Sequence, residues 1–328
     1  MVATPYRARV RVAVVCAVAT ALAGCTGGEP GAAPTSGMPT SAQSSPTVSA
    51  TPTPTPTPTP AVFDPAAALA TVEYLATRIG PREAASAAFD DAVRYVQSRF
   101  ESLGYRVTTM PVPVPAGDSW GVPVEAGTSE NVIADPPGFN PAQPHVVIGA
   151  HLDTVAVAPG AEDNGSGVAV VLELARLAGQ ERTPIPVRFI AFGAEEPRGR
   201  GDDLHHFGSQ DYVAALSGAE RRAIRAMVAL DRVGVRADAV PVSTGGTGTE
   251  AVLEALLAAA GSAGVPARQD DQNRASDHWS FEKADIPAAR LGSVPYAAYH
   301  TADDLPSVVD PRQLDWVGTI MWTWLQTL

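Results

Sequence analysis

The sequence predicts a single α/β domain with a mostly parallel, mixed central sheet and helices on both of its faces. Nearly continuous apolar runs at 146–150, 187–192 and 226–230 have the composition of strands buried on both sides. Segments with apolar residues at helical spacing lie between these runs. Strands that alternate with helices are typical of parallel sheets covered by helices, so this pattern sets the expected fold class.

Glycine and proline positions bound the other expected elements. Gly80, Gly104 and Gly264 each follow a segment of helical spacing, and glycine commonly ends helices. Prolines in 105–114 indicate an edge strand, which 131–134 is expected to pair with, because proline cannot donate to a neighbouring strand. The expected helices are 65–79, 82–103, 166–179, 249–263 and 311–328, and the remaining expected strands are 239–243 and 286–291.

Residues 1–24 are expected to be a lipoprotein signal peptide rather than part of the fold. Three arginines between positions 7 and 11 precede an apolar run at 12–23, which is shorter than the roughly 20 residues of a membrane-spanning helix. The run ends in Leu22-Ala23-Gly24-Cys25, which resembles a bacterial lipobox with cleavage before Cys25. The alternative is an ordinary secretory signal in which Cys25 is incidental.

Residues 25–62 are expected to be a lipidated cysteine and a disordered linker, which leaves 63–328 as the folded domain. The linker is rich in proline and threonine, and a segment of that composition cannot bury apolar surface. An acylated Cys25 would hold the protein on the outer face of the bacterial cytoplasmic membrane, with its domain outside the cell.

The charge balance argues against nucleic acid as a partner. The chain has 23 Lys and Arg against 35 Asp and Glu, a formal net charge of −12. Proteins that hold phosphate backbones usually carry a basic patch, and no basic cluster occurs in the expected domain. The sequence gives no indication of an oligomeric state.

Histidines and acids follow the ends of several expected strands. The carboxyl ends of parallel strands share one edge of a sheet, where open α/β sheets bind ligands, so these side chains are expected to meet. Each has an ordinary structural explanation on its own, but the set has the mixed imidazole and carboxylate donors that suit zinc. The set is His151, Asp153, Asp163, Glu195, Glu196, Asp231 and His300.

Spacing suggests separate tasks for some of these groups. His151 and Asp153 are two residues apart at a strand end and face one side, so Asp153 can accept a hydrogen bond from the imidazole while its other nitrogen binds a metal. Glu195 and Glu196 are adjacent and diverge, so one can bind a metal while the other acts as a base. Asp231 ends an apolar strand, where an acid is costly unless it is paired or bound.

The order of motifs in the domain resembles that of the secreted dizinc aminopeptidases, zinc exopeptidases related to glutaminyl cyclases. The resemblance runs from about Asp64 to the end of the chain, and the combination of motifs is highly specific. The matching motifs are His151-Leu152-Asp153, the Gly160–Gly167 segment GAEDNGSG, Glu195-Glu196, Gly208-Ser209, Leu230-Asp231, Ser276-Asp277-His278 and His300-Thr301.

The resemblance implies a site with two zinc ions, for which cobalt or manganese could substitute. Asp163 would bridge the ions. His151 and Asp231 would complete the site of one ion, and Glu196 and His300 that of the other. It also implies that Glu195 is the general base and that Asp153 supports His151.

The chain departs from the family pattern after Glu196. Eleven residues, 197–207, stand where many relatives have a shorter turn, and this insertion is expected to form a rim or lid over the site. It carries His205 and His206, which we interpret as loop histidines rather than ligands because the five-ligand set is already complete.

Three functions remain open at this point. The favoured one is an aminopeptidase that removes N-terminal residues from extracellular peptides. A glutaminyl cyclase is the second, but the resemblance implies that cyclases of this fold use one zinc and carry an acid where this chain has Ser276. A non-catalytic peptide-binding lipoprotein would be expected to have lost the base or a ligand, and none is missing.

Overall fold

The computed structural model describes residues 61–247 and 250–328. The expected signal peptide and nearly all of the expected linker, including Cys25, lie outside the described residues. Within them, no helix is both long and apolar enough to cross a bilayer.

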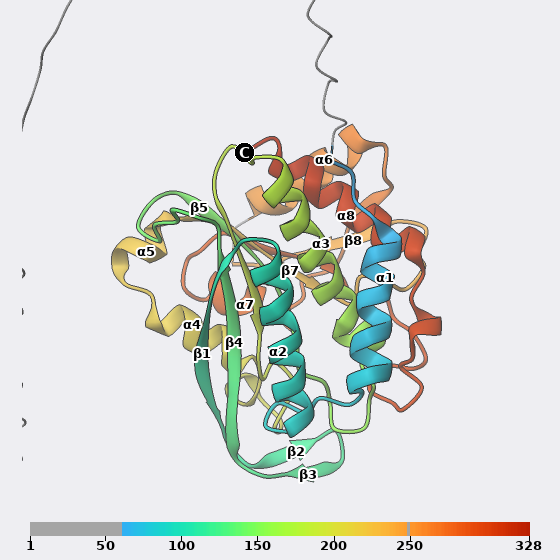
Figure 1. The fold of residues 1–328 in the computed structure, drawn as a ribbon. Coiled ribbons are helices and arrows are strands. Elements are labelled where there is room, and N and C mark those ends of the chain that lie inside the picture. The colour runs from blue at the N-terminus through green and yellow to red at the C-terminus, as the bar shows by residue number, and fades with distance from the viewer. Residues whose placement is uncertain (1–60, 248–249) are drawn as a thin grey trace, which may run out of the picture. The chain divides into compact units, whose positions relative to one another are not determined.

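A mixed sheet of eight strands forms the centre of the described domain, in the order β1-β4-β6-β5-β7-β10-β8-β9 (Figure 1). The pairs β6-β5, β5-β7, β7-β10 and β8-β9 are parallel, and the other three are antiparallel. The strands are β1 (Arg106–Val114), β4 (Gly127–Asp135), β5 (His145–His151), β6 (Val187–Phe192), β7 (Ile224–Asp231), β8 (Val240–Ser243), β9 (Ala267–Gln269) and β10 (Ala288–Gly292). The predicted class is therefore confirmed, with the parallel strands at its centre.

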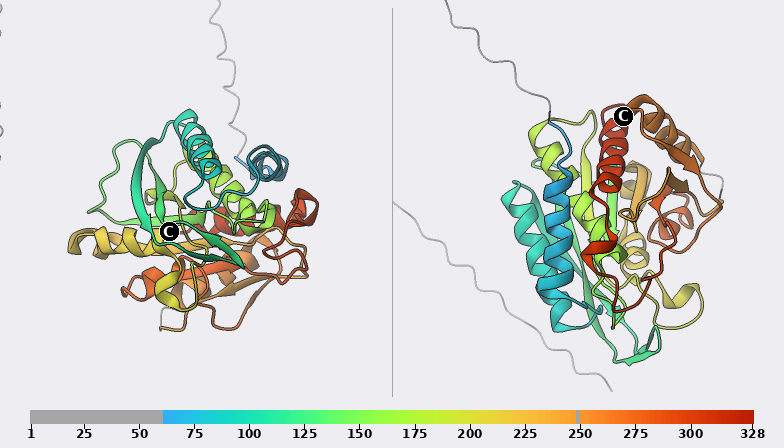
Figure 2. Two further views of the ribbon diagram at one scale, coloured as in Figure 1. Left: turned by 90° about the horizontal axis from the view of Figure 1, so that it is seen from below. Right: turned by 90° about the vertical axis from the view of Figure 1, so that its right-hand side faces the viewer.

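Helices cover both faces of the sheet (Figure 2). One face packs against α1 (Pro65–Glu73), α2 (Ala87–Ser102), α3 (Gly167–Gln180), α6 (Glu250–Ala263) and α8 (Pro311–Leu325). The other packs against α4 (Phe207–Ala215) and α7 (His278–Glu282), and α5 (Gly218–Ala223) leads into β7. The helical turns η1 (Tyr74–Ile79), η2 (Ala161–Ser166), η3 (Asp202–Leu204) and η4 (Pro306–Val308) complete the helical elements of the described residues.

Alternation along the central strands divides the core between the two faces. On β5, Val146 and Ile148 join the larger cluster with α1, α2 and α3, whereas Val147 between them joins the cluster of α4 and α7. Successive side chains of a strand point to opposite faces, so a strand between two helical layers is expected to be apolar at nearly every position. This requirement explains the continuous apolar runs in the sequence.

One expected helix begins later than its apolar spacing suggests. Residue 82 was the expected start, but α2 begins at Ala87 after Ser86, whose hydroxyl accepts a hydrogen bond from the Phe89 amide at 3.1 Å. A serine in this position satisfies an amide that the first helical turn leaves free. Arg82 therefore lies in a loop, and its side chain is fully buried.

The short elements were not predicted. They include a hairpin of β2 (Gly117–Ser119) and β3 (Val122–Val124), the strand β9 and the helices α4, α5 and α7. Most of them are too short for apolar periodicity to be read. The β2-β3 hairpin lies beyond one end of the long β1 and β4 strands (Figure 1), and its tip reaches the polar site described next.

Candidate metal centre

Four strand ends bring a buried cluster of histidines and acids together. His151 is the last residue of β5, Asp231 is the last residue of β7, and Glu195 and Glu196 follow β6. His300 lies in the loop after β10. All five are buried, with at most 6% of the residue surface exposed. The edge of the sheet therefore brings these five side chains together, as we expected from their positions after the strands.

Asp163 lies between the two histidines. Its Oδ1 is 3.1 Å from His151 Nε2 and its Oδ2 is 3.1 Å from His300 Nε2. His300 Nε2 is also 3.2 Å from Glu196 Oε2. Each oxygen of this one carboxylate thus faces a different imidazole, an arrangement that suits a carboxylate shared between two cations.

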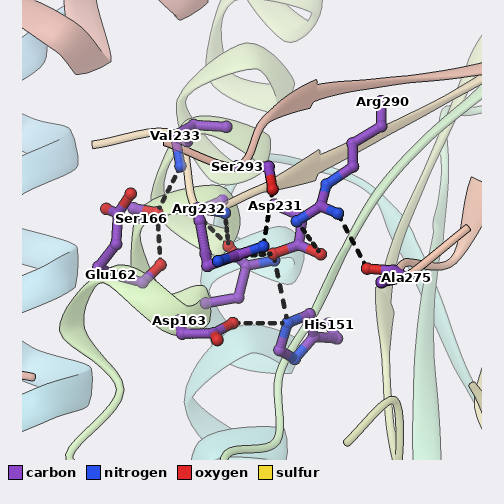
Figure 3. A network of polar contacts seen from close by, with 12 residues as sticks. His151, Glu162, Asp163, Ser166, Asp231, Arg232, Val233, Ala275, Arg290 and Ser293 are labelled. Carbon is purple, nitrogen blue, oxygen red and sulfur yellow. Dashed lines mark hydrogen bonds and ion pairs between the residues drawn. The ribbon is translucent and has the colours of Figure 1, made fainter. Parts of the chain in front are cut away.

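Asp231 completes the half of the cluster around His151. Its Oδ1 lies 3.7 Å from His151 Nε2, and its Oδ2 lies 3.0 Å from Nη2 of the fully buried Arg290 on β10. Figure 3 shows Asp231 between these two side chains, with Asp163 facing His151. Arg290 therefore holds one oxygen of Asp231 and leaves the other toward the cluster.

Burial and mutual charge shift the pKa values of the clustered groups strongly. Burial raises the pKa of Glu195 and of Glu196 to about 8, and neighbouring acids add to the rise. Burial alone would lower the pKa of His300, but Glu196 and Asp163 raise it to about 10. Burial opposes ionisation of Asp231 too, yet Arg290 and His151 hold its pKa well below the usual range. A cluster with these opposing shifts in a cleft is a candidate functional site.

Asp153 lies near His151, but it makes different bonds from those expected. The Nδ1 of His151 is 3.1 Å from the backbone oxygen of Asp153 and 3.7 Å from its carboxylate. The two carboxylate oxygens instead accept hydrogen bonds from the backbone amides of Glu195 and Glu196, both at 3.0 Å. The chain leaves β5 at His151, so the strict alternation of a strand does not extend to Asp153. Asp153 therefore ties the histidine loop to the glutamate loop.

Arg82 organises the loop that carries Asp163, a role that the sequence analysis missed. Its guanidinium donates to the backbone oxygens of Leu152, Pro159 and Gly160 at 2.6, 2.7 and 2.9 Å. Buried carbonyls without donors are costly, so this side chain fixes the path of the loop between β5 and η2. Asp304 holds the same loop from the other side by accepting from the Glu162 and Asp163 amides.

Arg290 was also missed, although the sequence held a clue to it. It is the one charged residue of β10, whose other residues are apolar or glycine. A lone charge in a buried strand is costly unless it is paired, and the same reasoning had singled out Asp231. Reading the two strands together would have predicted their ion pair.

Two of the other histidines make backbone contacts outside the cluster. His145 is buried at the start of β5, where its Nδ1 lies 2.8 Å from the Gln143 backbone oxygen. His278 is buried at the start of α7, and its Nε2 lies 2.8 Å from the Asn273 backbone oxygen. His206, by contrast, lies against Glu195, with 3.2 Å between His206 Nε2 and Glu195 Oε1.

A small cavity of about 80 Å³ opens onto the cluster. Trp120 from the β2-β3 hairpin and Tyr299 form aromatic parts of its wall, and the Trp120 ring lies edge-on to His300 at 4.4 Å. Pro197, His205 and His206 add a wall from the 197–207 insertion. The insertion is thus a rim of the cavity, as expected, and its Arg198 is anchored by Glu83.

The donor set fits a metal centre. Two sets of three groups have ligand atoms within 4.8 Å of one another: His151, Glu195 and Asp231, and His151, Asp163 and Glu196. Buried oxygens of Glu196 and Asp231 (Oε1 and Oδ1) have no hydrogen-bond partner among the described residues. Buried acids concentrated around two histidines need compensating positive charge, and imidazole with carboxylate is a donor set typical of zinc.

The fold and the donor set together define an α/β domain with a buried centre suited to metal ions. Residues 131–325 match the model of Peptidase family M28. The chain belongs to this family. The matched region begins in β4 and so leaves out Arg82 and the hairpin that carries Trp120.

Curated relatives support the same family. The chain is 33% identical over 204 residues to Aminopeptidase YwaD of Bacillus subtilis, covering 59% of this chain and 43% of that protein. It is 46% identical over 72 residues to a probable lipoprotein aminopeptidase, LpqL, of Mycobacterium tuberculosis, covering 22% of this chain and 13% of that protein. The chain aligns with about half the length of the first curated relatives it matches.

Solved structures share the fold. A zinc aminopeptidase from Bacillus subtilis superposes with a TM-score of 0.70 at 22% identity, covering 81% of this chain and 95% of that one. A glutaminyl cyclase from Bacteroides thetaiotaomicron superposes with a TM-score of 0.70 at 21% identity, covering 82% and 100%. Because peptidases and cyclases share this architecture, the fold alone does not choose between the two reactions.

Proposed function

We propose that this protein is a dizinc aminopeptidase that hydrolyses the N-terminal peptide bond of extracellular peptides. The observation that carries the proposal is Asp163, whose two oxygens each lie 3.1 Å from a different histidine nitrogen. A carboxylate in this position can serve two cations at once, because each of its oxygens faces a different imidazole. Membership of a peptidase family supports the hydrolytic reaction.

In this proposal five side chains hold the ions. Asp163 is shared, His151 and Asp231 serve one ion, and Glu196 and His300 serve the other. Asp231 has one oxygen held by Arg290, so it has a single oxygen to offer. When bound, the two ions supply Lewis acidity that lowers the pKa of a water toward about 7 and polarises the scissile carbonyl.

Glu195 is the proposed general base. It is buried beside the cluster, and its Oε2 lies 3.9 Å from His151 Nε2, so it faces the same space as the ligand atoms. Glu195 takes a proton from the attacking water and later returns it to the leaving amine, the usual share of a positioned carboxylate. Asp153 fixes the glutamate loop through the amides of Glu195 and Glu196.

The small cavity favours the end of a peptide over an internal bond. Its volume is about 80 Å³, and Trp120 of the hairpin and Pro197, His205 and His206 of the insertion contribute to its walls. Such a space accepts a terminal residue, whereas a chain that continued in both directions would meet these walls.

A substrate screen tests the reaction. The zinc-loaded protein is expected to release the N-terminal residue from aminoacyl anilides and short peptides, and to leave N-acetylated peptides intact. N-terminal glutamine peptides distinguish the cyclase, which would release ammonia and form pyroglutamate without cutting the chain. Cyclisation without peptide hydrolysis would contradict the proposal.

We also propose that Cys25 anchors the protein to the outer face of the cytoplasmic membrane. The lipobox-like Leu22-Ala23-Gly24-Cys25 supports this location. In the native bacterium, Cys25→Ser is expected to remove the lipid and shift the protein out of the membrane fraction or leave it unprocessed. A wild-type protein that is recovered without lipid by mass spectrometry would refute the anchor.

A further inference from the structure

The 197–207 insertion ends beside the proposed base and not over open solvent. His206 is its penultimate residue and directly precedes α4. The backbone amide of His206 donates to the backbone oxygen of Glu195 at 2.9 Å, and the backbone amide of Phe207 donates to the backbone oxygen of Ala194 at 2.8 Å. These two bonds fix the end of the insertion to the glutamate loop.

Close packing behind the insertion fixes its position further. A Cβ on Gly208 would lie 2.1 Å from the backbone oxygen of Gly193, so the two segments touch where no side chain fits. Asn131 joins them by donating to the Gly208 oxygen at 2.8 Å and accepting from the Gly193 amide at 3.0 Å. The position of His206 relative to Glu195 is therefore set by rigid backbone contacts on both sides.

The side chain of His206 points at the base. Only 2% of the residue is exposed, and its Nε2 lies 3.2 Å from Glu195 Oε1. Neither ring nitrogen makes a hydrogen bond among the described residues, so Nε2 is left to face the Glu195 carboxylate alone. The other carboxylate oxygen, Oε2, lies on the side of His151. The two oxygens of Glu195 thus face different partners.

The surroundings of His206 favour a neutral imidazole. Burial lowers its pKa, and the charge of Lys283 lowers it further, against the opposite influence of Asp277, Asp202 and Asp231. The ring of His205 lies 5.5 Å away. A neutral imidazole carries one proton, and a proton on Nε2 lets the ring donate to the Glu195 carboxylate.

We propose that His206 is a positioning residue for the general base: its Nε2–H donates to Glu195 Oε1 and holds Oε2 toward the reacting water. The inference rests on the proposed function for its kinetic consequence, but the hydrogen bond itself does not depend on the reaction. It gives the insertion a role in positioning the base, beyond the rim or lid expected from the sequence.

A matched pair of substitutions isolates the hydrogen bond. Glutamine places an N–H donor near the position of Nε2, whereas methionine has nearly the same length and shape without a donor. His206→Met is expected to lower kcat about 10- to 100-fold with KM changed less than about threefold, since a base held loosely loses part of its 10²–10⁴-fold contribution. His206→Gln is expected to restore kcat to within about fivefold of wild type.

Zinc content and melting temperature are measured for both variants, and both quantities should match those of the wild type. Asp203→Asn, an exposed change in the same insertion, serves as the control and should leave kcat unaltered. If the Met and Gln variants had equal kcat, or if the Met variant lost zinc in proportion to its activity, the inference would be overturned.

A spectroscopic readout tests the bond without relying on turnover. The chain has 6 histidines, so ¹⁵N-histidine NMR resonances can be assigned by their loss in His206→Gln. His206 is expected to be the Nε2–H tautomer in metal-free and zinc-loaded protein alike. The Nδ1–H tautomer would overturn the inference even in an active enzyme. Absence of peptidase activity together with the Nε2–H tautomer would instead refute the proposed function and keep the contact.

Discussion

Glu195→Gln is expected to lower turnover by a factor of about 10²–10⁴ while zinc content and melting temperature stay at wild-type values. The amide keeps the size of the carboxylate and can still accept one hydrogen bond, but it cannot take a proton from water. Turnover on an aminoacyl anilide and elemental analysis of the same sample measure both parts of the result.

Glu196→Gln provides the matched control, because the same chemical change falls on the adjacent residue. Glu196 lies 3.2 Å from His300 and is assigned as a ligand, so zinc occupancy should fall and activity should partly return with excess zinc. The two phenotypes should differ in kind, one kinetic and one in metal content. Loss of zinc in Glu195→Gln with full occupancy in Glu196→Gln would reverse the two assignments.

Asp163→Asn is expected to have the largest effect on activity, a loss of at least about 10⁴-fold. The two ions together supply several kcal/mol of transition-state stabilisation, and the rate depends exponentially on the activation free energy. An amide offers one neutral oxygen in place of a shared carboxylate, so zinc content should fall to one ion or fewer per chain.

The melting temperature gives a second measure of the Asp163 variant. A ligand at 100 times its Kd stabilises the folded state by about 2.7 kcal/mol, so zinc should raise the melting temperature of the wild type. The increase should shrink or vanish in Asp163→Asn. Asp303→Asn, an exposed acid near the site, should keep the full increase. An equal zinc-dependent increase in both variants would contradict a bridging role.

The parts of the site that the sequence predicted are those tied to strand ends. His151 and Asp231 are the last residues of buried strands, and an apolar run locates such an end within a residue or two. The parallel order then places them at one edge of the sheet. Roles drawn from the resemblance, such as that of Asp163, stay predictions that the geometry of the cluster supports.

The parts that the sequence could not predict depend on contacts between distant segments. Arg82 meets its acceptors 70 to 78 residues away along the chain, and no local pattern marks such a side chain. Trp120 reaches the cavity through a hairpin of three-residue strands, which leaves too little alternation to detect. The carboxylate of Asp153 bonds the glutamate loop instead of His151, because β5 ends before Asp153.

The contact between His206 and Glu195 could not be predicted from the sequence of the insertion. The resemblance to the family led us to interpret 197–207 as an insertion, and inserted residues are usually at the surface. Here backbone bonds to Ala194 and Glu195 turn the end of the insertion inward and bury the histidine. This pairing depends on the conformation of the whole loop, which neither composition nor spacing specifies.

The central claim is that two metal ions act together at the edge of this sheet. Titration of metal-free wild-type protein with zinc, following bound metal and peptide hydrolysis in the same sample, tests it most directly. Full activity is expected to require two zinc ions per chain, and chelation should remove it reversibly. Full peptidase activity with a single zinc ion per chain would contradict a two-metal mechanism.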